Sequence, residues 1–355
     1  MYVNTASSVN VALHQGLRWL LVGGNTETSR NGDVLVAPAP VLTVSTKPRN
    51  RVLISETRGA NPFFHLMESL WMLAGRCDLG WLAHYNKRML EYSDDGGITQ
   101  PGAYGYRWRN FFGYDQINQV VDILKKDRKS RRAVLTMWDA GVGHTDVPGR
   151  ETEIVIGDMA MGMAGSRDIP CNTHVYFDTH GDRLNMTVCC RSNDIWWGAH
   201  GANAVHFSFL LEYIAAKTQL PMGVMRQFSN NYHLYTGVVP KDTIGDVARE
   251  VMASDFYANE RSSDIFVSIF NGDPHDFDTD LLTFMEGVEW HQDAYRTPFF
   301  KHLVLPMAVA WGFHKKKDYE GALHMAKSIT ADDWRTAAVA WLARARQNYE
   351  AKKGS

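Results

Sequence analysis

A predicted β-hairpin in the middle of the chain constrains the fold more than any other feature. Apolar and polar residues alternate over 175–178 and again over 184–189, with the turn-like run His180-Gly181-Asp182 between them. A hairpin folds the chain back on itself, so the segments just outside its two ends lie close together. Those segments hold Cys171 at one end and Arg191-Ser192-Asn193-Asp194 at the other.

Cys171 is a candidate nucleophile because of this setting. Most lone cysteines are buried structural residues, but the preceding Pro170 and the following Asn172 do not resemble a core strand. A thiol becomes a good nucleophile when a neighbouring cation favours the thiolate, and Arg191 could supply that charge. The arrangement predicts covalent catalysis on an anionic substrate.

Composition limits the kinds of protein that this chain can be. Its 355 residues and 45% hydrophobic content allow a substantial core, and a net charge of −2 argues against a nucleic-acid-binding surface. Four cysteines without a CxxC pair fit a reducing cytoplasm. No stretch resembles a signal peptide or a transmembrane helix. We therefore expect a soluble cytoplasmic protein that binds neither nucleic acid nor membranes.

Helical and strand patterns are mixed along the chain without a repeating strand–helix–strand order. Helices are predicted over 1–20, 63–74, 117–126, 202–218 and 334–349, and strands over 34–44, 133–138 and 225–235. A loop is predicted over 25–33, a turn over 102–108 and irregular structure over 140–168. This mixture predicts an α+β fold with a mixed β-sheet and packed helices. We expect a catalytic core over 1–240 and a mainly helical C-terminal extension over 241–355, packed on the same domain.

Four arginines form a candidate phosphate site. Arg131 and Arg132 stand directly before a predicted strand, Arg30 lies in a Gly- and Asn-containing loop, and Arg191 lies near the cysteine. Guanidinium groups bind phosphate oxygens in a bidentate way, although most arginine pairs belong to solvated charged turns. Spacing alone does not bring the four together.

Further polar residues suit a nucleotide. Glu68 stands in an apolar helix, where a carboxylate is costly unless it is partnered or functional, so it is a candidate general acid or base. Asn203 is either a helix N-cap or an amide that pairs with the imide N–H and carbonyl of uracil. His233 and Tyr235 share a strand face and could reach a sugar hydroxyl, or be satisfied core residues. No metal-site spacing and no Gly-rich phosphate motif is evident.

Several motifs in order over residues 20–240 resemble the thymidylate synthase superfamily, which includes pyrimidine-nucleotide hydroxymethylases. The motifs are Glu68-Ser69-Leu70-Trp71, Ala103-Tyr104-Gly105, Ser130-Arg131-Arg132, Pro170-Cys171, Arg191-Ser192-Asn193-Asp194, Asn203 and His233-Leu234-Tyr235. The resemblance implies the thymidylate synthase-like fold. It also implies a homodimer in which Arg131 and Arg132 complete the phosphate site of the neighbouring subunit.

The resemblance also implies a mechanism. Cys171 adds to C6 of the pyrimidine while Asn203 holds the base, Tyr104 helps to remove the C5 proton, and Glu68 assists proton transfers through ordered water. The residues implied to bind the nucleotide are Arg30, Arg131, Arg132, Arg191, Ser192, Asn203, His233 and Tyr235. The one-carbon donor is 5,10-methylenetetrahydrofolate, with Trp71, Leu90 and Asp194 at its site and Asp194 also in a catalytic role.

Departures from the synthase pattern favour hydroxymethylation over methylation. Asn172 stands where the synthases have His, and the loop before Asn203 is one residue longer and holds Trp196 and Trp197. Leu90 stands where the synthases pack a Trp against folate, and the family's short folate-closing tail is not visible. A synthase must exclude water while hydride moves. These changes would admit water and yield a hydroxymethyl group.

We therefore expect a one-carbon transferase that hydroxymethylates a pyrimidine nucleoside monophosphate, with dUMP favoured over dCMP or CMP. An Asp in place of Asn203 is the family's usual mark of a deoxycytidylate enzyme, but a flipped amide also pairs with cytosine. The alternatives are a thymidylate synthase, a cytidylate C5 methyl- or hydroxymethyltransferase, and a non-catalytic nucleotide-binding protein on the same fold. A cysteine hydrolase would need a His and an acid around Cys171, and His174 and His200 lack a recognised partner pattern. If the chain is phage-encoded, its location is the host cytoplasm.

Overall fold

A six-stranded mixed β-sheet forms the centre of the computed structural model, which describes residues 1–29, 32–55, 57–141, 157–250, 255–258, 273–287 and 291–354. In spatial order its strands are β1 (Tyr2–Ala6), β4 (Val41–Ser45), β9 (Met222–Ser229), β7 (Leu184–Cys190), β6 (Asn172–Asp178) and β5 (Val134–Thr136). β1 with β4 and β7 with β9 are parallel pairs, and the other neighbours are antiparallel. The predicted hairpin is thus confirmed as β6 and β7.

A second sheet of four strands joins two of the sequence motifs. In spatial order its strands are β2 (Asn25–Ser29), β3 (Gly32–Val36), β10 (Tyr232–Tyr235) and β8 (Asn193–Asp194). β8 follows β7 along the chain and pairs in parallel with β10, so that Asp194 lies opposite His233. The motif that begins at Arg191 and the motif that ends at Tyr235 therefore meet side by side.

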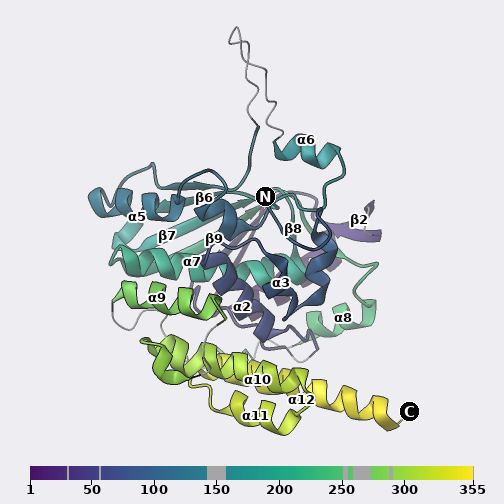
Figure 1. Ribbon diagram of the computed structural model, residues 1–355. Helices are drawn as coiled ribbons and strands as arrows, with labels where there is room; N and C mark the ends of the chain where they lie inside the picture. The colour runs from purple at the N-terminus through teal and green to yellow at the C-terminus, as the bar shows by residue number, and fades with distance from the viewer. Residues whose placement is uncertain are drawn as a thin grey trace.

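Two long buried helices connect the sheet to the rest of the molecule. α7 (Asn203–Lys217) packs against β7 and β9, and α2 (Pro62–Leu73) packs on α7 (Figure 1). The other α-helices described are α1 (Val9–Gly23), α3 (Leu79–Ala83), α4 (Tyr104–Arg109), α5 (Gln116–Lys126), α6 (Asp158–Met163), α8 (Lys241–Arg249), α9 (Pro274–Met285), α10 (Leu305–Lys315), α11 (Tyr319–Lys327) and α12 (Asp332–Gly354).

Local sequence signals set both ends of α2. The Asn61 side chain caps the helix by accepting from the backbone N–H of Phe64, and Pro62 suits the first turn, where its missing N–H is not needed. After the C-cap, Gly75 adopts φ +72°, a left-handed conformation that glycine tolerates without strain. The helix predicted over 63–74 is confirmed.

Several local predictions are wrong. Helix α6 lies within the segment 140–168, which was predicted to be irregular, and three further segments also differ. The first residues form β1, paired with β4, instead of beginning a helix. The predicted loop over 25–33 contains the paired strands β2 and β3. The predicted turn over 102–108 contains helix α4. Gly105 allows α4 to lie close to α2, because a Cβ atom there would lie 1.9 Å from the carbonyl oxygen of Met72.

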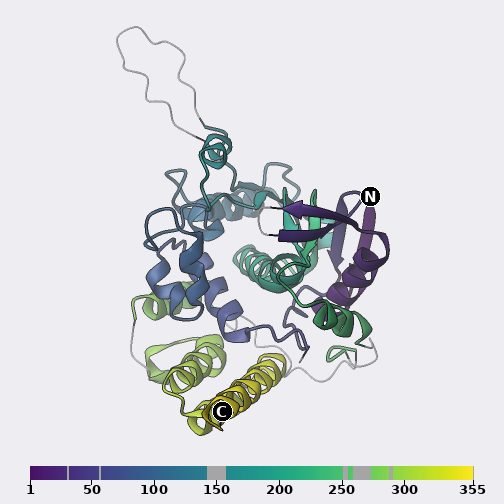
Figure 2. The same ribbon diagram turned by 90° about the vertical axis from the view of Figure 1, so that its right-hand side faces the viewer.

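The C-terminal helices α10, α11 and α12 form a layer beyond α2 (Figures 1 and 2). Phe63 of α2 contacts the rings of Trp311 and Trp341, with centroids 5.6 and 5.5 Å away. One cluster of buried apolar side chains runs from the central sheet and α2 into these helices. The predicted α+β fold with C-terminal helices is confirmed, while the boundary at residue 240 stays a prediction. No helix among the described residues is long and apolar enough to cross a membrane.

Candidate active site

The hairpin of β6 and β7 brings Cys171 and Arg191 together. The backbone N–H of Arg191 donates to the carbonyl of Cys171 over 2.9 Å, and Nη2 of Arg191 lies 3.9 Å from Sγ of Cys171. The guanidinium also donates to the two carbonyls of residues 169–170, which hold it in place. Asn172, next to the cysteine, accepts a hydrogen bond from the thiol of Cys190 over 2.8 Å. A cation held beside a thiol favours its nucleophilic thiolate form.

Tyr104, at the start of α4, belongs to the same group of side chains. Burial raises the pKa of its phenol well above the usual value, and Coulomb interactions with Cys171, Cys190 and Glu68 raise it further, whereas Arg191 lowers it. The phenol is therefore protonated at neutral pH. Tyr104 therefore lies close enough to Cys171 and Glu68 to interact with both electrostatically.

Glu68 on α2 and His206 on α7 meet where the two helices pack. Nε2 of His206 lies 2.9 Å from Oε2 of Glu68, and their side chains are only 2% and 8% exposed. His206 was not predicted from the sequence, although it follows Asn203 by three residues on a helix and so shares its face. Beside them, burial and the charges of Arg58 and His206 lower the pKa of His65 to about 3, so its imidazole is neutral.

The amide of Asn203 is buried and bonded to Asn193. Nδ2 of Asn203 donates to Oδ1 of Asn193 over 3.1 Å, and Asn193 donates in turn to Gln227 and Ser229. No role was predicted for Asn193 or Gln227. The one sequence signal was the place of Asn193 inside the motif Arg191-Ser192-Asn193-Asp194.

The carboxyl group of Asp194 has one oxygen that accepts hydrogen bonds and one without a partner among the described residues. Its Oδ1 accepts from the backbone N–H groups of Trp196 and Trp197 over 2.9 and 2.6 Å. Oδ2 is buried and has no hydrogen-bond partner among the described residues. Burial raises the pKa of Asp194 to about 6, although its hydrogen bonds and the charge of Arg58 lower it. Such an oxygen can accept a hydrogen bond from a ligand N–H.

His233 and Tyr235 lie on β10, beside the strand that carries Asp194. Their rings meet edge to face with centroids 4.9 Å apart, and the ring of Trp197 lies 6.3 Å from Tyr235. Burial lowers the pKa of His233, so its imidazole is neutral and can donate as well as accept a hydrogen bond. Both functions suit a sugar hydroxyl.

The other residues predicted to bind phosphate lie in different settings. Ser192 is partly buried between Arg191 and Asn193. Arg131 and Arg132 are exposed in the turn before β5. Arg30 lies outside the described residues.

The two predicted folate contacts other than Asp194 differ in exposure: Trp71 is buried and Leu90 is exposed. Trp71 is 1% exposed and its Nε1 donates to the carbonyl of Asp78 over 3.0 Å, so its ring faces the protein interior. Leu90 lies on the 3-10 helix η1 (Lys87–Tyr92) and is 41% exposed. Contact with folate stays a prediction for both.

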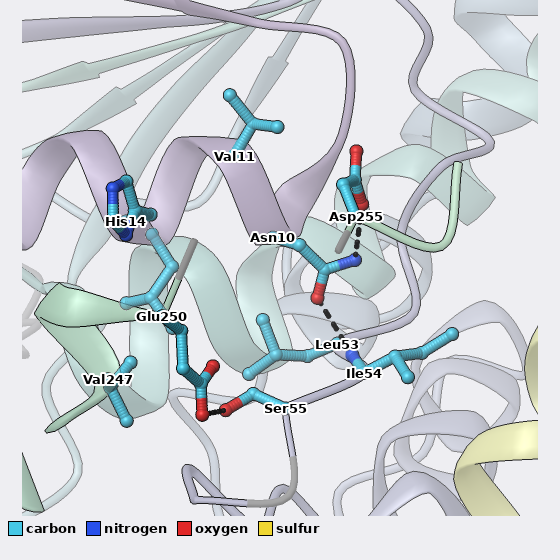
Figure 3. A pocket seen from close by; sticks show the side chains of 10 residues that line it. Asn10, Val11, His14, Leu53, Ile54, Ser55, Val247, Glu250 and Asp255 are labelled. Atoms are coloured by element: carbon cyan, nitrogen blue, oxygen red, sulfur yellow. Dashed lines mark hydrogen bonds between the residues drawn. The ribbon is translucent and has the colours of Figure 1, made fainter. Parts of the chain in front are cut away.

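A separate pocket lies between α1, α8 and the segment 53–55 (Figure 3). Several of its polar groups are hydrogen-bonded to one another: the N–H of Ile54 donates to Asn10 over 2.8 Å, and Ser55 donates to Glu250 over 3.0 Å. Its volume of about 40 Å³ has room for water but not for a nucleotide. In the part of the chain that the structure describes, no group of three His, Cys, Asp or Glu side chains could hold a metal ion.

Comparisons with known proteins agree on one family. Residues 54–254 match the thymidylate synthase family. The chain is 39% identical to a deoxyuridylate hydroxymethyltransferase of Pseudomonas phage M6 over 361 residues, 99% of this chain and 97% of that protein. It is 32% identical to the protein of the same name from Bacillus phage SP01 over 58% of this chain and 54% of that protein. The crystal structure of thymidylate synthase from T4 phage has a similar fold, with a TM-score of 0.50, 18% identity and coverage of 67% of this chain and 80% of that one.

Proposed function

The chain belongs to the thymidylate synthase family, and from that premise we propose that it hydroxymethylates C5 of dUMP. The similarity to the deoxyuridylate hydroxymethyltransferase of Pseudomonas phage M6 extends over nearly the whole chain and supports this substrate and product. The observation that carries the chemistry is the thiol of Cys171 with the Arg191 guanidinium 3.9 Å away.

On the nucleotide, Cys171 attacks C6 of the uracil ring and thereby makes C5 nucleophilic. Asn203 hydrogen-bonds the base, and the hydroxyl oxygen of the neutral Tyr104 phenol helps to remove the C5 proton by accepting a hydrogen bond from the water that takes it. Glu68, paired with His206, moves protons through water at the base. His233 and Tyr235 bind the sugar. The arginines proposed to bind the phosphate are Arg30, Arg131, Arg132 and Arg191, with Ser192 beside them.

One observation supports a folate-binding role for this site. The Oδ2 oxygen of Asp194 is buried without a partner among the described residues, and a pterin ring offers N–H groups to such an acceptor. We propose that Asp194 holds the folate, with Trp71 and Leu90 near it. 5,10-Methylenetetrahydrofolate would supply a one-carbon unit at the oxidation level of formaldehyde. Leu90, exposed and without a large ring, supports access of water to the product-forming position.

We also propose a homodimer in the cytoplasm of the cell, or of the host if the chain is phage-encoded. Arg131 and Arg132 are exposed in a turn, which leaves them free to approach a second subunit. Two guanidinium groups from a neighbour would add positive charge where the phosphate binds.

Replacing the nucleophile tests the covalent mechanism. Cys171→Ala should abolish turnover of dUMP while leaving binding of dUMP measurable by calorimetry. Cys189→Ala is the matched control, because Cys189 is also a partly buried thiol of this region and has no proposed role. Turnover by Cys171→Ala at the wild-type rate would overturn the mechanism.

A further inference from the structure

We propose that Asn193 is a positioning residue that determines which base the site accepts. Through a chain of buried hydrogen bonds that starts at a backbone carbonyl, it holds the Asn203 amide in one orientation and so favours uracil over cytosine. The inference rests on the proposed function, in which Asn203 reads the base.

This series of hydrogen bonds starts at the backbone carbonyl of Ala199. A backbone carbonyl can only accept a hydrogen bond. Nε2 of Gln227 donates to the carbonyl of Ala199 over 3.1 Å, and both residues are at most 1% exposed. The Gln227 amide therefore has a fixed orientation, in which Oε1 points away from Ala199 and is available as an acceptor.

The next link is Asn193, which is 2% exposed. Its Nδ2 lies 3.3 Å from Oε1 of Gln227, 2.9 Å from Oγ of Ser229 and 3.5 Å from Sγ of Cys190. Because Gln227 offers an acceptor, Asn193 must present its donor end there. Its Oδ1 then faces Asn203 and accepts from Nδ2 of that residue over 3.1 Å.

Reversal of any one amide would bring two like ends together in a place that water does not reach. Leaving a buried donor or acceptor unpaired costs about 1–3 kcal/mol. The Ala199 carbonyl therefore fixes the orientation of the Gln227 amide, which fixes that of Asn193 and, through it, that of Asn203. Gly198 leaves the space for this contact: a Cβ atom there would lie 3.1 Å from Oδ1 of Asn193.

The sense of the Asn203 amide decides between the two bases. Uracil has an N3–H donor beside an O4 acceptor, whereas cytosine has an N3 acceptor beside an amino donor. An amide pairs with either base, but in opposite orientations. With the base position set by Cys171 and the phosphate site, an Asn203 that cannot flip accepts only one of the two.

The test measures discrimination between dUMP and dCMP. We expect the wild type to prefer dUMP, and Asn193→Leu to lower the dUMP-to-dCMP ratio of kcat/KM by about tenfold or more. Gln227→Met removes the link to the carbonyl and should lower the same ratio. The matched control is Asn185→Leu, because Asn185 is also buried and hydrogen-bonded but lies at the opposite end of β7 from Cys190. It should lose stability without changing the ratio.

An unchanged ratio in a folded Asn193→Leu protein would overturn the inference; if that variant does not fold, an unchanged ratio in Gln227→Met would do so. Dissociation constants of dUMP and dCMP, measured by calorimetry on the same proteins, separate this outcome from failure of the proposed function. If the wild type forms no hydroxymethyl product but prefers dUMP and loses that preference in the variants, the proposed reaction fails and the role of Asn193 stands.

Discussion

At the scale of single residues, the electrostatic surroundings of Cys171 differ from those of the other three thiols. Burial raises the pKa of Cys77, Cys189 and Cys190, for Cys190 well above the usual value. Cys171 instead has the Arg191 guanidinium 3.9 Å from its sulfur. The thiolate is the nucleophilic form, so Cys171 should be the most reactive of the four.

Removing the guanidinium should therefore slow the chemistry of this thiol. We expect Arg191→Met to lower the rate of Cys171 alkylation by iodoacetamide at pH 7 by about tenfold, because the thiolate loses its nearby cation. Peptide mass mapping identifies the modified cysteine, and Cys171→Ala removes its signal. An unchanged alkylation rate in a folded Arg191→Met protein would contradict this role for Arg191.

At the scale of secondary-structure elements, the packing of α2 on α7 creates a buried acid–base pair. Glu68 comes from α2 and His206 from α7, and neither side chain is more than 8% exposed. A buried carboxylate with few partners destabilises a fold, so its presence here points to function.

Replacing Glu68 should affect catalysis and stability differently. Glu68→Gln keeps the shape but removes the charge, so kcat should fall by about 100-fold while the free energy of unfolding is kept or rises. Steady-state kinetics and urea denaturation measure the two. Ser69→Ala, which removes a hydrogen bond to the His65 carbonyl on the same helix, is the control and should keep its kcat. A Glu68→Gln enzyme that is fully active would refute the acid–base role.

At the scale of the whole molecule, α12 is tied to the core through a buried carboxyl group. Tyr257 donates to Oδ2 of Asp333 over 3.0 Å, and the N–H of Val52 donates to the Tyr257 oxygen over 3.2 Å. Burial raises the pKa of Asp333 to about 7, although its hydrogen bonds and Arg51 lower it. The unfolded chain has an aspartate pKa of about 3.9. The native state thus binds this proton more tightly, and stability falls as pH rises from about 4 to about 7.

Asp333→Asn should remove this dependence on pH. We expect the variant to gain on the order of 2 kcal/mol of unfolding free energy relative to the wild type between pH 5 and pH 8. Urea denaturation at the two pH values measures the gain. A difference that is constant with pH would show that Asp333 does not titrate in this range.

The proposed homodimer is also a property of the whole molecule. If Arg132 serves a neighbouring subunit, co-expression of an Arg132→Ala chain with a Cys171→Ala chain should restore activity, because each heterodimer then has one complete site. Homodimers of either variant are the controls. Failure of confirmed heterodimers to turn over dUMP would contradict a shared site.

How far the sequence predicted the molecule depended on the range of each interaction. The hairpin of β6 and β7 and the capped helix α2 follow from local patterns and were predicted. Helix α4 and strand β1 were not, because their contacts with α2 and β4 come from elsewhere in the chain. The same reason hides the pairs Glu68–His206 and Asn193–Asn203, since no spacing rule links α2 to α7 or shows which way an amide points.

The most direct test of the central claim is the mass of the product formed from dUMP and 5,10-methylenetetrahydrofolate. Addition of CH₂O should raise the nucleotide mass by about 30 Da, because water completes the reaction. Parallel incubations with dCMP and CMP should give little product. A gain of about 14 Da would mean that a hydride reaches the base and water is excluded, and it would contradict the proposed hydroxymethylation.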